Sequence, residues 1–117
     1  MNITKVDFVI LNNASFEASV ELKESELPID LTGFTFYMQC RPSYQSSTVY
    51  FEVSSNPNGG ITVDPTHGKF TISLPISLTS TFTWQDGVYD VVAQKSDGTQ
   101  LRALEGSVFI DFGTTQV

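Results

Sequence analysis

Two segments decide the fold of this chain: GKFTISLP at residues 68–75 and DGVYDVVAQKSDGTQ at residues 86–100. In both segments apolar and polar residues alternate, the apolar ones being Phe70, Ile72, Leu74, Tyr89, Val91 and Ala93. Alternation with a period of two is typical of a β-strand with one face in a hydrophobic core. The turn-forming pair Asp97-Gly98 predicts that the second segment is a hairpin, which returns through Val108 and Ile110.

The same pattern recurs towards the N-terminus. Strands are predicted around residues 6–11, 16–22, 34–41, 49–53 and 61–63, separated by turn-forming Asn, Pro, Gly and Ser. Seven to eight short strands with this spacing predict an all-β fold, an antiparallel immunoglobulin-like β-sandwich. The expected core includes Phe36, Met38, Phe51, Ile72, Tyr89, Val91 and Val108. Helix is expected only as one or two turns between Pro75 and Trp84, because Ser and Thr dominate there.

Tyr89 has a further interpretation. It enters a late strand directly after the turn at Asp86-Gly87, as the tyrosine of a tyrosine corner does in immunoglobulin-like sandwiches. There the hydroxyl group ties down a crossing loop. Ordinary core packing explains a single tyrosine equally well.

The length of 117 residues predicts one domain over residues 1–117. Within it, residues 1–11 form a possible attachment strand and residues 112–117 a loose tail. No secretion signal is visible, and the longest apolar run, Phe8 to Leu11, is far too short for a membrane span. We therefore expect a protein that is made in a cytoplasm and has no membrane partner.

The charge of the chain bears on its partners. Thirteen acidic and six basic residues give a net charge of −7, and the basic residues are dispersed. Because the phosphate backbone repels such a surface, we expect no nucleic-acid partner.

Residues for catalysis or metal binding are few. The only histidine, His67, lies in a predicted turn, and the only cysteine, Cys40, lies in an alternating strand where a buried small apolar side chain is expected. One His and one Cys do not make a zinc site, and no Gly-x-Ser-x-Gly motif is present. A calcium site remains a possibility, because five Asp residues lie at or beside predicted turns: Asp30, Asp64, Asp86, Asp90 and Asp97. Hydrogen bonding within the turns explains these residues as well. We expect no catalytic residues, no metal, no cofactor and no enzymatic activity.

Aromatic residues give a second candidate surface. Tyr37, Tyr44, Tyr50 and Trp84 are available for a sugar-binding platform. For Tyr37 and Tyr50, on outward positions of two strands, we prefer cross-strand pairing within one sheet. Burial in a subunit contact is a further possibility, since Tyr is enriched at interfaces.

The first strand is the candidate protein interface. It has little charge after Asp7, no Pro, and apolar side chains on both faces. Unprotected sheet edges invite pairing with other chains. We therefore predict an interface made by Val6, Phe8, Val9, Ile10, Tyr37 and Tyr50. The alternative is that this strand is buried within its own domain.

An ordered set of turn motifs then carries a resemblance to a known family. The motifs occupy residues 28–36 (PIDLTGFTF), 58–65 (NGGITVDP), 68–75 (GKFTISLP), 86–91 (DGVYDV) and 104–108 (LEGSV). Together they resemble small virion-associated proteins of tailed bacteriophages, including the amino-terminal sandwich domain of upper baseplate proteins. The similarity extends from about Phe16 to Ile110. The chain departs from the pattern at Asn12–Ser15, where such domains usually carry a Gly-Asp step, and we expect a bare module without a long carboxy-terminal extension.

The resemblance implies a structural module of a phage virion, assembled in the bacterial host cytoplasm. It would attach to other virion structural proteins in the tail or the head–tail (collar or baseplate) region, as part of a symmetric multi-copy assembly. Two alternatives stay open: a capsid decoration protein, and a carbohydrate-binding module that contacts the host surface.

Overall fold

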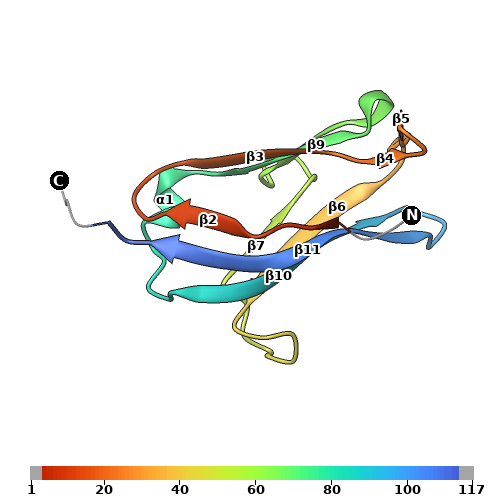
Figure 1. The fold of residues 1–117 in the computed structure, drawn as a ribbon. Coiled ribbons are helices and arrows are strands. Elements are labelled where there is room, and N and C mark those ends of the chain that lie inside the picture. The colour runs from red at the N-terminus through yellow and green to blue at the C-terminus, as the bar shows by residue number, and fades with distance from the viewer. Residues whose placement is uncertain (1–3, 114–117) are drawn as a thin grey trace.

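Two β-sheets face each other in the computed structural model, which describes residues 4–113 (Figure 1). Buried apolar side chains fill the space between them. The strands are β1 (Thr4–Lys5), β2 (Phe8–Leu11), β3 (Phe16–Glu21), β4 (Lys23–Glu24), β5 (Leu27–Pro28), β6 (Thr35–Arg41), β7 (Phe51–Ser54), β8 (Ile61–Asp64), β9 (Lys69–Leu74), β10 (Asp86–Gln94) and β11 (Gln100–Asp111). The short helices are η1 (Pro65–His67) and α1 (Ile76–Thr79). The all-β sandwich predicted from the sequence is confirmed.

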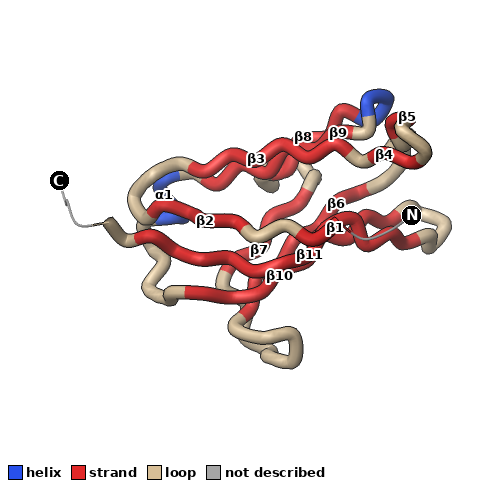
Figure 2. Tube along the Cα trace, in the orientation of Figure 1, coloured by secondary structure: helices blue, strands red, loops and turns tan. Residues whose placement is uncertain are grey.

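The order of the strands explains the immunoglobulin-like character of the sandwich. The larger sheet runs β11-β10-β6-β7, with β1 and β2 added alongside β11, and the smaller sheet runs β3-β9-β8. This arrangement matches the G-F-C-C′ and B-E-D sheets of an immunoglobulin variable-type domain. The chain crosses between the sheets after β2, through residues 22–34 (which include β4 and β5), after β7, and through α1, which Figure 2 shows at one end of the sandwich.

The core follows the alternation in the sequence. All seven residues expected there are buried, and Phe36 and Phe70 meet across the two sheets with ring centroids 4.9 Å apart. Cys40 is buried among them, and burial raises the pKa of its thiol to about 12. A thiol that stays protonated is not a nucleophile, so Cys40 packs as a small apolar side chain.

Three local predictions needed correction. Pro65 begins a 3-10 turn, so helix is not confined to residues 75–84; the fixed φ of proline suits the first position of a helix. Val49 lies outside β7 and is exposed. Residues 23–28 form a small extra hairpin, β4–β5, whose tip has positive φ at Ser25 and Glu26.

Candidate interaction surface

The first strand lies parallel to β11 at the edge of the larger sheet. Thr4 and Lys5 pair with Leu104 and Glu105, and Phe8–Leu11 pair with Val108–Asp111, in a constant register. Figure 1 shows β2 beside β11, with β3 in the other layer. Strands β1 and β2 therefore belong to the larger sheet of this domain.

A local junction between β1 and β2 holds this segment in place. The Tyr89 hydroxyl donates a hydrogen bond to the Val6 carbonyl oxygen at 2.6 Å, and the Ser107 N–H donates to Asp7 Oδ1 at 2.9 Å. Gly106 lies beside them with no room for a Cβ atom, which would collide with the Val6 carbonyl oxygen. The Tyr89 hydroxyl thus holds another segment in place, as the tyrosine-corner interpretation anticipated. That segment is the junction between β1 and β2, where a crossing loop was expected.

The two faces of β2 differ sharply in exposure. Phe8 and Ile10 point into the core, where Phe8 packs against Tyr89 and Phe16 with ring centroids 5.1 and 5.5 Å away. The structure therefore corrects the assignment of these two residues to an interface, because the core already covers them. Val6 is half-buried against the core, and Val9 keeps 59% of its surface exposed.

Val9 belongs to a patch that we call the outer apolar strip, made of Val9, Leu11 and Phe109. Val9 is the cross-strand partner of Phe109, and Leu11, 53% exposed, lies two residues further along the same face. Leu11 and Phe109 are functional candidates that the sequence reasoning missed. The alternation of side chains along the strand could have identified Phe109, because it lies between the core residues Val108 and Ile110 and must therefore point outward.

Carboxylates border the outer apolar strip. Asp111 is the cross-strand partner of Leu11, and Asp86 is the partner of Phe109 on its other side. Asp7 precedes β2 and lies two residues before Val9, so it follows the same alternation as Val9 and Leu11. None of the three forms an ion pair within residues 4–113. The strip is therefore an apolar surface in a negative electrostatic environment.

The predicted pairing of Tyr37 with Tyr50 is wrong. Strands β6 and β7 are neighbours, but their register pairs Tyr37 with Ser54 and places Tyr50 at the other end of the hairpin. Tyr37 is 39% exposed beside Val92, whereas Tyr50 stacks on Trp84 with centroids 4.3 Å apart and an interplanar angle of 3°. Because Tyr50 and Trp84 cover each other's faces, they do not form an open sugar platform with Tyr37.

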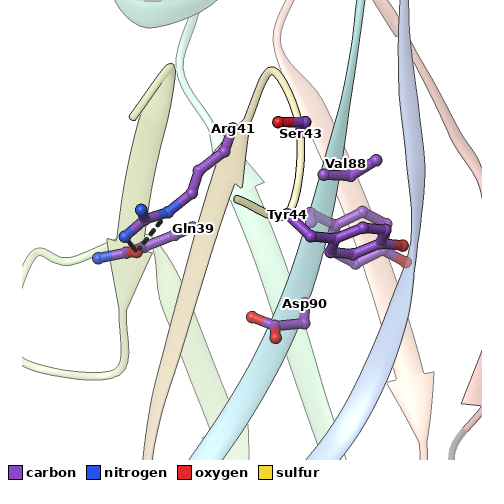
Figure 3. A pocket seen from close by; sticks show the side chains of 7 residues that line it. Gln39, Arg41, Ser43, Tyr44, Val88 and Asp90 are labelled. Carbon is purple, nitrogen blue, oxygen red and sulfur yellow. Dashed lines mark hydrogen bonds between the residues drawn. The ribbon is translucent and has the colours of Figure 1, made fainter. Parts of the chain in front are cut away.

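A shallow hollow of about 210 Å³ lies on the outer face of the larger sheet (Figure 3). Tyr44, from the loop between β6 and β7, lies over β10 beside Val88 and Asp90. The Arg41 guanidinium is occupied, since it donates to Gln39 Oε1 and to the Ser46 carbonyl oxygen. Asp90 lies 3.6 Å from the Arg102 guanidinium, so both charged side chains of the hollow already have partners. The hollow is also smaller than ordinary ligand pockets of about 300–1,000 Å³.

The turn carboxylates are used locally. Asp30 Oδ1 accepts hydrogen bonds from the hydroxyl and N–H of Thr32, and these bonds lower its pKa. Asp97 Oδ1 accepts from the Thr99 N–H, which likewise lowers its pKa. Asp64 contacts the exposed His67 ring at 3.0 Å. Within residues 4–113 no group of three or more His, Cys, Asp or Glu side chains is placed to hold a metal ion.

Over residues 4–113, no helix has the length and apolar character needed to cross a membrane. No protein-family model and no curated protein sequence matches this chain.

One solved phage structure has the same fold as this chain. The N-terminal domain of ORF48 of phage TP901-1 superposes with a TM-score of 0.56 at 11% identity, over 94% of this chain and 85% of that domain. Extracellular domains 3–5 of Drosophila OTK give a TM-score of 0.40 at 12% identity, over 89% of this chain and 32% of that structure. Because the identity is only 11%, the likeness to the phage domain shows a common β-sandwich fold alone.

Proposed function

We propose that this chain is a structural component of a tailed-phage virion. In this proposal it is an immunoglobulin-like module that attaches through protein–protein contacts in the tail or the head–tail region. It is assembled in the bacterial host cytoplasm, is present in multiple symmetric copies, and acts without enzymatic activity, nucleic acid or membrane.

The observation that carries the proposal is the fold shared with a phage domain over nearly the whole chain. The ordered turn motifs of the phage-like family add independent support, and two of them contain residues that the junction uses. Tyr89 belongs to the motif at residues 86–91 and Gly106 to the motif at residues 104–108.

The surface agrees with a role in assembly. An apolar strip at a sheet edge is unusual on an isolated small domain and is typical of a protein contact. The burial of Cys40 and the hydrogen bond between His67 and the turn residue Asp64 agree with the proposed role without catalysis.

The test is to purify phage particles and quantify this chain by mass spectrometry with labelled standard peptides. A copy number from a few to a few dozen supports a tail or collar position. Hundreds of copies would place the protein on the capsid as a decoration instead. Absence from particles that are otherwise complete would contradict the proposed function.

A further inference from the structure

The free edge of β2 presents unpaired backbone groups. The N–H groups of Val6 and Asn12 donate to the carbonyl oxygens of Glu105 and Asp111, each at 2.9 Å. In a parallel ladder every second residue bonds the neighbouring strand, so the even-numbered residues of this segment face β11. The N–H and C=O groups of Val9 and Leu11 consequently point away from the sheet, and within residues 4–113 β2 pairs only with β11.

Two other edge strands, β3 and β7, are protected in ways that β2 is not. Strand β3 carries Glu17 and Glu21 on its exposed side. Strand β7 has its edge covered where the Ser54 N–H donates to Gly59 and Ser54 bridges Gly60. Charged side chains and covering segments are the usual means of preventing edge pairing. Strand β2 has the sequence FVIL, with neither charge nor proline.

The carboxylates around the outer apolar strip decide between possible occupants. Asp7, Asp86 and Asp111 border the strip without an ion-pair partner among the described residues, and the whole chain carries a net charge of −7. A second copy in a symmetric β2–β2 contact would bring a second set of these carboxylates, and a second net charge of −7, to the same edge. Gathering like charges at one contact disfavours this pairing, whereas Lys or Arg side chains in the occupant would favour binding.

We infer that the free edge of β2 receives an extended segment of another protein, which adds a strand to the larger sheet. Its side chains on the outer face are apolar beside Val9 and Leu11 and basic beside Asp7. Main-chain hydrogen bonds to Val9 and Leu11 supply affinity, and the side-chain pattern supplies specificity. This inference deepens the proposed function, on which the identification of the partner as a virion protein rests.

The first experiment uses a synthetic probe and the full chain. The probe is the blocked heptapeptide Lys-Thr-Val-Thr-Val-Thr-Lys, which places Lys and Val on one face of a strand. We expect slower amide hydrogen exchange at Val9 and Leu11 in its presence, and binding that weakens as salt is raised. Replacing both Lys by Glu should weaken binding by roughly tenfold or more, since each charge contact changes from attraction to repulsion.

The matched variants are Val9→Lys and Leu27→Lys. Both replace an exposed apolar residue, but Leu27 lies in the β4–β5 hairpin, which Figure 1 shows at the other end of the sandwich from the arrowhead of β2. Val9→Lys should abolish binding of the probe and leave folding intact, while Leu27→Lys should bind as the parent does. Equal binding by both variants would overturn the inference.

Three outcomes separate the inference from its rivals and from the proposed function. A concentration-dependent dimer in sedimentation velocity that Val9→Lys abolishes, with no binding of the probe, would identify a second copy as the occupant and overturn the inference. If the Val9→Lys protein enters phage particles at the parental copy number, the edge contact is refuted while the virion role stands. If the probe binds as expected but the chain is absent from particles, the edge contact is supported and the virion role fails.

Discussion

The Tyr89 hydroxyl group donates a hydrogen bond to the carbonyl oxygen of Val6, which lies 83 positions earlier in the sequence. The turn before it and its place in an alternating strand allowed a structural hydroxyl bond to be anticipated. Its partner, the Val6 carbonyl, was not predictable, because local periodicity does not specify which distant backbone group lies within reach. The same limit applies to Asp7, which bonds the Ser107 N–H across a sequence separation of 100.

Removing the hydroxyl group by Tyr89→Phe should lower the free energy of unfolding by about 0.5–1.5 kcal/mol, because the Val6 carbonyl loses its partner while the ring stays packed. Amide exchange at Phe8–Leu11 should accelerate more than exchange in β9. Urea unfolding and hydrogen exchange measure the two effects. Tyr44→Phe is the control, since Tyr44 is 66% exposed and should show no change in either.

Adding a methyl group by Gly106→Ala should displace the β1–β2 junction. The new Cβ would lie 2.7 Å from the Val6 carbonyl carbon and 3.0 Å from Asp7 Oδ1, so the N-terminal segment must move. We expect a loss of stability of about 1–3 kcal/mol, the usual cost of overpacking, measured by urea unfolding. Ser107→Ala, at the next position, adds no volume and keeps the backbone N–H; equal stability losses at the two positions would contradict this account.

The elements divide into those that local sequence predicts and those that it does not. Strands β6, β9 and β10 were evident because their buried and exposed residues alternate without interruption. The β4–β5 hairpin was missed because it has only two residues in each strand and includes Pro28. The sequence also left open whether the first strand is an attachment arm or part of the core. Its parallel pairing with β11 shows that one face belongs to the core and the other to the surface.

The two faces of β2 give a matched pair of substitutions. Ile10→Ala removes a fully buried side chain and should cost about 2–5 kcal/mol, through lost burial and the cavity left behind. Val9→Ala, at the exposed neighbouring position, should change the free energy of unfolding by less than about 0.5 kcal/mol. Urea denaturation of both variants checks this, and comparable losses would mean that the two faces are assigned the wrong way round.

The whole molecule should be stable without metal. Asp30 and Asp97 each accept turn hydrogen bonds through Oδ1, and no metal-binding cluster exists within residues 4–113. A ligand that binds only the folded state must raise its melting temperature. Melting curves with EDTA and with added calcium should therefore coincide within the scatter of the measurement. A rise with calcium that EDTA reverses would revive the calcium site.

Stability of the whole molecule should fall at alkaline pH, because the folded domain holds protons that the unfolded chain releases. Burial raises the pKa of Cys40 from 9.0 to about 12, and burial also raises the pKa of Tyr89 above its ordinary value. Above pH 9 the unfolded chain binds fewer protons than the folded domain, so the free energy of unfolding decreases as pH rises. This contribution is complete below pH 9 and is lost progressively towards pH 12.

Cys40→Ala isolates the thiol contribution to this loss. The variant should be less stable than the parent at pH 7, since it removes a buried group, but its stability should decline less steeply between pH 9 and 10. A single group that titrates only in the unfolded chain contributes a slope of up to about 1.36 kcal/mol per pH unit. Urea unfolding at pH 7, 9 and 10 measures the slope for both proteins. Parallel curves would show that the thiol is exposed to solvent in the folded domain, and the inward assignment of β6 would then be wrong.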